Sequence, residues 1–131
     1  LILKEKTLSD SIINTLPGMF YLFNDKHELL RWNKNFEILT GYQPDEIKNT
    51  PATSMIAKED RENVGQAINK AFVDGFATVE ERSVNKDGSK TPFFYSGALL
   101  IYQDQRCLLG VGIDISPRLK VEEELRLSEQ K

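Results

Sequence analysis

The stretch VGIDISPRLKVEEELRLSEQK, Val111–Lys131, places a strand directly before a helix. An apolar strand pattern ends at Asp114-Ile115-Ser116, and a charged amphipathic pattern with helical spacing continues to the last residue. We predict Ser116 as the N-cap and Pro117 as the first helical residue, because each is favoured at that position. A strand that passes into a projecting helix is typical of an output lever. We therefore expect the chain to transmit a conformational state and to catalyse no reaction.

The remaining segments predict an α+β fold. The expected order is helix, two strands, several short helices, a longer helix, three strands and the final helix. Asp87-Gly88 predicts a tight hairpin turn, because this pair accepts positive φ angles. The expected ranges are a helix at 1–15, strands at 19–24 and 29–33, a short helix at 34–42, helical turns at 43–59, a helix from Asp60 to Gly75, and strands at 76–84, 91–102 and 107–115. This order predicts a five-stranded antiparallel sheet with helices over one face and amphipathic helices at both ends.

Length and composition indicate one globular domain. The chain has 131 residues, of which 40% are hydrophobic, and a formal net charge of −3 without a basic block. This balance argues against nucleic acid as a partner. No apolar run approaches the ~20 residues of a membrane span, so we expect no membrane contact within this segment. The single cysteine, Cys107, cannot form an internal disulfide and is compatible with a reducing, cytoplasmic location.

Three stretches carry a resemblance to a known family. They are NKNFEILTGYQPDEI (33–47), NKDGSKTPF (85–93) and GVGIDIS (110–116), in this order and with fitting spacing. On these stretches the chain resembles a PAS domain across roughly residues 8 to 116. The resemblance implies a helical side that can enclose a ligand. It also implies a sensory or dimerising role in a larger signalling protein, such as a two-component histidine kinase or a diguanylate cyclase.

The resemblance suggests a division of the chain into three parts. These are an N-terminal flanking helix at 1–15, a PAS-like sensor domain at 16–116, and a C-terminal signalling helix at 117–131. The segment is expected to be an excerpt of a longer protein, with a downstream effector in the same chain. In the family, the residue that matches Asp114 helps to join the last strand to the exit helix. We therefore expect Asp114 and Ser116 to act in signal relay.

The sequence contains no convincing catalytic or metal-binding group. His27 is the only histidine and lies in a predicted polar turn, so a surface side chain is the expected role. Cys107 lies among apolar residues and is expected to be a small buried side chain. Glu80 and Glu81 are neighbours on a strand and should point to opposite faces. We therefore predict no catalytic residue and no metal ligand.

The cofactor stays unknown at this point. Some PAS relatives attach flavin through a cysteine in the helical region, but residues 34–75 contain none. Others hold haem through a histidine on the long helix, and residues 60–74 contain none. Both observations argue against covalent flavin and histidine-ligated haem, whereas non-covalent flavin and haem held by another residue stay open.

Apolar and aromatic side chains are predicted to converge between the sheet and the helices, where the resemblance places a possible small-molecule ligand. A close-packed core without a cavity is the alternative, because protein interiors are normally dense. The candidates for a pocket are Phe20, Leu22, Phe36, Met55, Ile56, Ile68, Phe72, Phe93 and Tyr95.

The final helix offers a thin apolar seam through Val121, Leu125 and Ser128. This seam and the N-terminal helix suggest a homodimer, but fewer than two heptads are present. Two functions follow: a sensory module that relays ligand or partner binding through the C-terminal helix, or a ligand-free dimerisation scaffold.

Overall fold

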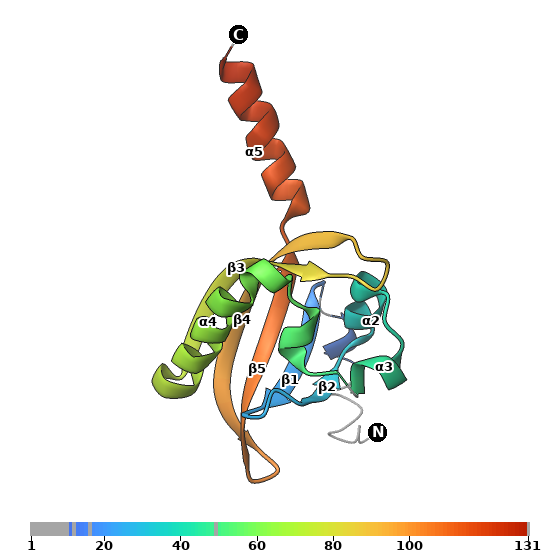
Figure 1. Ribbon diagram of the computed structural model, residues 1–131, viewed down its shortest axis with the longest axis vertical. Coiled ribbons are helices and arrows are strands. Elements are labelled where there is room, and N and C mark those ends of the chain that lie inside the picture. Colours follow the sequence, from blue (N-terminus) through green and yellow to red (C-terminus); the bar gives the residue numbers. More distant parts are fainter. Residues whose placement is uncertain (1–10, 12, 16, 49, 131) are drawn as a thin grey trace, which may run out of the picture.

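A five-stranded antiparallel sheet forms the centre of the molecule, with strand order β2-β1-β5-β4-β3. The computed structural model describes residues 11, 13–15, 17–48 and 50–130. Helices α2, α3 and α4 lie over one face of the sheet, and α5 stands clear of the rest of the molecule (Figure 1). The elements are β1 (Met19–Asn24), β2 (Leu29–Trp32), α2 (Lys34–Thr40), α3 (Pro44–Lys48), η1 (Ala52–Met55), η2 (Lys58–Asp60), α4 (Arg61–Asp74), β3 (Phe76–Val84), β4 (Lys90–Tyr102), β5 (Gln105–Asp114) and α5 (Ser116–Glu129). The predicted α+β class and five-stranded antiparallel sheet are confirmed.

The predicted helix ends follow from local chemistry. The side chain of Asn33 accepts a hydrogen bond of 3.1 Å from the backbone N–H of Phe36, which caps α2 at its start. Gly41 ends α2 and Gly75 ends α4, with φ angles of 80° and 96°. These left-handed angles are readily adopted only by glycine. Both ends therefore lie where the glycines predict them.

The tight hairpin lies in a different turn from the one predicted. Gln103 and Asp104 have φ angles of 51° and 62°, and Tyr102 pairs with Gln105 across the β4–β5 turn. Two positive φ angles are typical of a two-residue hairpin loop. In the β3–β4 turn only Gly88 has a positive φ, of 88°, within a longer loop. The prediction at Asp87-Gly88 was therefore right about a turn and wrong about its type.

The exit helix begins one residue earlier than predicted. Ser116 is already helical, Ile115 is the cap residue, and Pro117 lies in the first turn. The side chain of Asp114 accepts a hydrogen bond of 2.8 Å from the backbone N–H of Ser116. Because aspartate bonds the N–H two residues ahead, Asp114 supplies the capping oxygen that was expected from Ser116.

Most of the predicted N-terminal helix at 1–15 lies outside the described residues. Residues 11 and 13–15 are helical. The backbone oxygen of Ile13 accepts a bond of 3.0 Å from the Asn33 side chain. The Asn14 side chain accepts a bond of 3.1 Å from the backbone N–H of Lys34. These contacts connect the described end of the N-terminal segment to the start of α2. Among the described residues, no helix combines the length and apolar character needed to cross a membrane.

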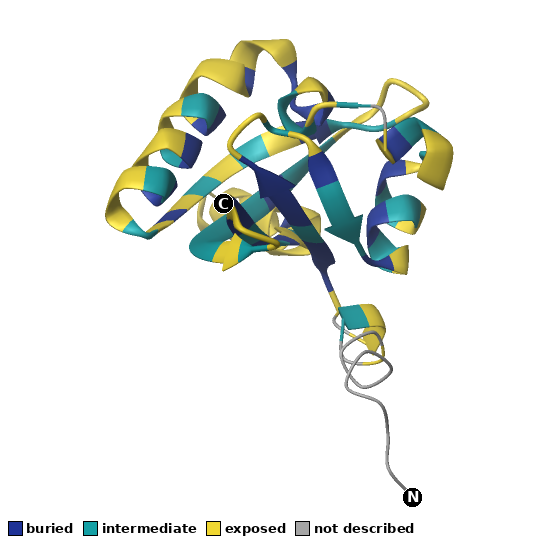
Figure 2. Cartoon of the chain, turned by 90° about the horizontal axis from the view of Figure 1, so that it is seen from below, coloured by how far each residue is buried: buried dark blue, intermediate teal, exposed yellow. Residues whose placement is uncertain are grey.

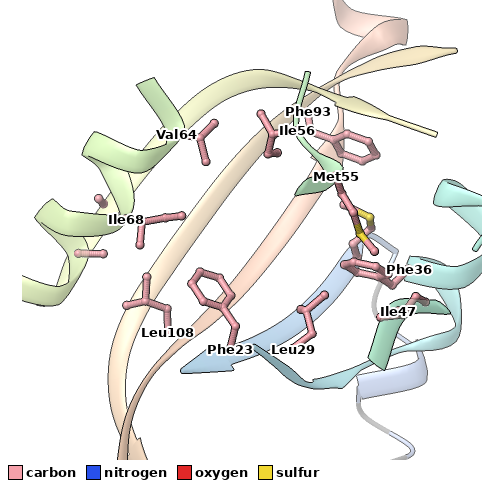
Figure 3. Packing of buried hydrophobic residues seen from close by; sticks show 13 residues of the cluster. Phe23, Leu29, Phe36, Ile47, Met55, Ile56, Val64, Ile68, Phe93 and Leu108 are labelled. Carbon is pink, nitrogen blue, oxygen red and sulfur yellow. The ribbon is translucent and has the colours of Figure 1, made fainter. Parts of the chain in front are cut away.

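The core lies between the sheet and the helices on its covered face. Figure 2 shows β1 almost wholly buried and α4 buried along one side only. In Figure 3, Ile68 of α4 points across this layer toward Phe23 and Leu108 of the sheet. The buried cluster consists of Met19, Phe23, Leu29, Phe36, Ile47, Met55, Ile56, Val64, Ile68, Ala71, Ala77, Phe93 and Leu108.

Candidate functional site

A cavity of about 90 Å³ opens within this core, between the covered face of the sheet and the helices. Side chains from the sheet form its floor, and α2, η1 and α4 supply its walls. It is lined by Met19, Tyr21, Phe23, Leu29, Phe36, Thr40, Ala52, Thr53, Met55, Ile56, Val64, Ala67, Ile68, Ala71, Ala77, Val79, Ser83, Tyr95, Ser96, Gly97 and Leu108. The close-packed alternative therefore does not describe this core.

Five of the nine predicted pocket residues line the cavity, namely Phe36, Met55, Ile56, Ile68 and Tyr95. Two others belong to the core without lining the cavity. Phe93 is fully buried in the cluster. Phe72 packs at the edge of the cluster, where the Arg106 guanidinium lies 5.7 Å from its ring centre.

Phe20 and Leu22 were assigned to the wrong face of β1. They are buried, but the cavity is lined by Met19, Tyr21 and Phe23. Successive strand residues point to opposite faces of the sheet. Placing one residue on the wrong face therefore places every second residue of the strand on the wrong face as well. MFYLFN is apolar at nearly every position because β1 is buried on both sides. The alternation that would have indicated the correct face is therefore absent.

Two glycines of β5 make room for aromatic rings on the cavity floor. A Cβ on Gly110 would lie 2.0 Å from Cε2 of Tyr21. A Cβ on Gly112 would lie 3.2 Å from Cδ1 of Tyr95. Tyr21 and Tyr95 pack edge to face, with ring centres 6.3 Å apart. The GVG sequence thus allows both tyrosines to lie against the sheet, which a side chain on Gly110 would prevent.

The polar groups of the cavity are uncharged. Burial, reinforced by the neighbouring Tyr95, raises the pKa of Tyr21 above its ordinary range. Burial likewise raises the pKa of Tyr95, and the Ser83 hydroxyl partly offsets this. The Tyr21 hydroxyl donates a long bond of 3.4 Å to the backbone oxygen of Ser96. The Thr40 hydroxyl donates a bond of 2.6 Å to the backbone oxygen of Phe36.

Ser83 is the unusual polar residue. It is 2% exposed, and among the described residues its Oγ makes no hydrogen bond of ordinary geometry, although it lies near enough to the Tyr95 hydroxyl to lower the pKa of that phenol. Ser83 lines the cavity and pairs with Ile56 through an isolated bridge. Buried hydroxyls normally find a partner, so an unpaired one at a cavity wall indicates where a bound molecule could contribute a bond.

The residues considered for chemistry lie apart from one another. His27 is partly buried in its turn, with its ring centre 5.9 Å from that of Phe23, so it is less exposed than expected. Cys107 is buried, as expected, and burial raises the pKa of its thiol. Glu80 pairs with Arg118, whereas Glu81 accepts a bond from Asn63. Within the described ranges, no group of three or more His, Cys, Asp or Glu side chains could hold a metal ion.

The junction between β5 and α5 is tied to the sheet by several polar contacts. The N–H of Ile115 donates a bond of 3.1 Å to the backbone oxygen of Pro92 in β4. Nη2 of Arg118 lies 3.1 Å from both carboxylate oxygens of Glu80 in β3. Together with the Asp114 cap, these contacts hold the first turn of α5 against two strands.

Comparison with known proteins identifies the family to which this fold is similar. A family model described as the PAS fold matches residues 29–113. No curated protein matches the chain. A PAS domain from Colwellia psychrerythraea is similar in structure, with a TM-score of 0.77 and 19% identity over 87% of this chain and 99% of that one.

Two further solved structures are similar. The PAS domain of an HTR-like protein from Haloarcula marismortui has a TM-score of 0.74 and 17% identity over 84% of this chain and 91% of that one. A domain of a sensory box sensor histidine kinase/response regulator from Geobacter sulfurreducens has a TM-score of 0.69 and 16% identity over 84% and 94%.

PAS domains are typically sensory and non-catalytic modules of signalling proteins. The family match covers most of the sheet and all of the helices on its covered face. This chain belongs to the PAS fold family.

Proposed function

We propose that the chain is a sensory module in which a small molecule in the cavity, or a bound partner, changes the position of α5. A downstream effector in the same protein would respond to that change. The domain division at 1–15, 16–116 and 117–131 and a cytoplasmic location are part of the same proposal. The free thiol of Cys107 is compatible with that location. The module itself has no catalytic role in this proposal.

The observation that carries the proposal is that β5 both borders the cavity and leads directly into the exit helix. Leu108 of β5 lines the cavity, and Gly110 and Gly112 lie against the two tyrosines. β5 ends at Asp114, and α5 begins at Ser116, so a single residue separates them. A shift of the tyrosine rings therefore has a short, hydrogen-bonded route to α5. A ligand can drive this shift only by binding one arrangement more tightly than the other.

We predict that Asp114→Ala loosens the junction while leaving the fold intact. The substitution removes the acceptor of the 2.8 Å bond from the Ser116 N–H. Loss of a capping side chain costs about 1 kcal/mol at the helix end. We expect amide exchange at residues 115–120 to rise about fivefold, with a thermal midpoint near that of the unmodified chain. Effector output of the parent protein should change. Unaltered exchange and output at normal stability would contradict the relay role.

A constitutive dimerisation scaffold is the second candidate function. It is favoured by α5, which buries none of its residues and exposes Val121, Leu125 and Leu127. An unpartnered helix with exposed apolar side chains is suited to pairing with a second copy. In this alternative the cavity stays empty and the module only brings two effectors together.

Native mass spectrometry of the purified 131-residue chain separates the two functions. A sensory module should carry a bound small molecule or acquire one from a cell extract, whatever its oligomeric state. A scaffold should appear as a dimer of unmodified mass. A dimer that never acquires a ligand from any extract would reject ligand sensing and support the scaffold.

A further inference from the structure

We infer that the cavity takes a small, uncharged ligand of about one ring, with one hydroxyl or comparable hydrogen-bonding group that pairs with Ser83 Oγ. This inference rests on the proposed sensory function and specifies its ligand class. Three features of the cavity support it: its volume, the absence of charge in its lining, and a buried serine hydroxyl that makes no hydrogen bond of ordinary geometry.

The volume limits the size of the ligand. Sites for drug-sized molecules measure roughly 300–1,000 Å³, and an engineered apolar cavity of roughly 150 Å³ accommodates benzene. The cavity here is about 90 Å³. It fits a single six-membered ring only with slight side-chain adjustment, which flexible Met19 and Met55 in its wall can provide. A flavin or haem would require the helices to move away from the sheet.

The lining excludes a charged ligand. None of the side chains that line the cavity carries a charge, and both tyrosines stay protonated because burial raises their pKa values. Asp60, a nearby carboxylate that influences Tyr95, is already paired with Arg82. An ion in this cavity would lose its hydration without gaining a counter-charge, which costs several kcal/mol. A neutral molecule avoids that cost.

The few polar groups of the lining determine how the ligand lies. Ser83 Oγ makes no hydrogen bond of ordinary geometry, and the Tyr95 hydroxyl, whose pKa it lowers, is its neighbour. Most of the lining is apolar, with Phe23, Leu29 and Leu108 among its residues. A ring with one hydroxyl can bury its carbons against these apolar side chains. Its hydroxyl can then both donate to and accept from the hydroxyls of Ser83 and Tyr95.

The test compares p-cresol, toluene and 4-methylbenzoate, which share a methyl-substituted ring and differ in one group. Each is titrated into the isotope-labelled 131-residue chain and followed by NMR. We expect p-cresol and toluene to shift cavity residues, and 4-methylbenzoate to bind at least ~100-fold more weakly than p-cresol. Binding of the carboxylate with the affinity of p-cresol, or no binding of the two neutral probes, would overturn the inference.

Ser83→Ala tests the hydrogen bond itself. The quantity compared is the toluene Kd divided by the p-cresol Kd, measured once in the variant and once in the unmodified chain. This comparison cancels the different hydrophobicity of the two probes. One neutral hydrogen bond contributes about 1 kcal/mol, so this ratio should fall about fivefold in Ser83→Ala. The variant should fold normally, because it removes a hydroxyl that makes no hydrogen bond of ordinary geometry. An unchanged ratio would reject Ser83 as the anchor.

Thr40→Val is the matched control. Thr40 also lines the cavity, but its hydroxyl already donates to the Phe36 backbone oxygen. Its removal should leave the Kd ratio within about twofold of the unmodified chain, whereas a fivefold fall would count against Ser83 as the specific partner. The same spectra report on the relay separately. Ligand binding with the expected selectivity but without shifts at residues 115–120 would support the ligand class and reject the proposed transmission.

Discussion

Gly110→Ala should destabilise the fold by about 3 kcal/mol, the largest effect that we expect from adding a single methyl group to this chain. The new Cβ would lie 2.0 Å from Cε2 and 2.4 Å from Cζ of Tyr21. The Tyr21 ring cannot move aside freely, because it packs against Phe23, Phe36 and Tyr95 at ring-centre distances of 6.0 to 6.4 Å. Urea unfolding at pH 7 measures the loss.

Gly97→Ala is the matched control for this prediction. Gly97 pairs directly with Gly110 across β4 and β5 and lies on the same face of the sheet. A Cβ there would meet only the Leu108 side chain, with Cδ1 at an ordinary 3.8 Å and Cβ at 4.0 Å. Neither glycine has a positive φ, so backbone strain does not separate them. We expect Gly97→Ala to change the free energy of unfolding by less than about 1 kcal/mol.

A double-mutant cycle tests whether the Tyr21 ring is the cause. In a Tyr21→Ala background the ring is gone, so adding Gly110→Ala should cost less than about 1 kcal/mol further. A full 3 kcal/mol loss in that background would place the constraint elsewhere in the strand. Equal losses for Gly110→Ala and Gly97→Ala would likewise show that the tyrosine contact is not responsible.

This tyrosine–glycine contact also shows where prediction from the sequence ends. Strand positions and helix ends follow from local signals, such as Gly41 and Gly75 after apolar helical patterns. Which face of β1 meets the cavity does not follow from local signals, because all but one of the β1 residues are buried. The partners of Gly110 and Glu80 depend on long-range packing. Glu80 and Arg118 are 38 residues apart, and no local pattern brings them together.

The candidate site was predictable to a similar extent. Residues of η1 and α4 were found because the cavity lies between the sheet and the helices, where their apolar side chains were expected to converge. Ser83 was missed because it is a polar residue near the end of a strand in which most residues are exposed or only partly buried. Nothing in the local sequence distinguishes a buried, unpaired serine from a solvated one. Its bridge to Ile56 is a tertiary contact, which local sequence does not predict.

Asp60→Ala should lower the free energy of unfolding by about 2 kcal/mol. Asp60 is 8% exposed and accepts three bonds from Arg82: from the backbone N–H at 3.1 Å, Nε at 3.0 Å and Nη2 at 3.3 Å. These bonds connect η2 at the start of α4 to β3. The substitution leaves the Arg82 N–H without this acceptor, which accounts for most of the expected loss.

Glu59→Ala is the natural comparison, since Glu59 also pairs with Arg82, at 3.5 Å, from the preceding position. Its side chain is 60% exposed, so water replaces the lost partner and we expect little change in stability. Urea unfolding of both variants under the same conditions provides the measurement. If the two variants lost equal stability, the burial of Asp60 would not be the deciding factor.

The pH dependence of unfolding gives a second test of the same pair. The hydrogen bond from Arg82 holds the pKa of Asp60 below its ordinary value, although burial acts in the opposite direction. A folded-state pKa below the unfolded value of about 3.9 stabilises the fold above pH 4. That contribution is lost as the pH falls through the folded-state pKa. Asp60→Asn, which cannot ionise, lacks this titration.

The unmodified chain and Asp60→Asn should therefore differ most near pH 7 and converge as the pH falls below 4. This convergence reports the contribution of Asp60 alone to the pH dependence of stability. The pKa values of Glu46 and Glu59 are also lowered, but these two residues titrate in both proteins and their contributions cancel. Free energies of unfolding in urea at pH 7, 5, 4 and 3 measure it. A constant difference across this range would mean that the Asp60 charge contributes nothing to stability, and that Asp60 acts through its hydrogen bonds to Arg82 alone.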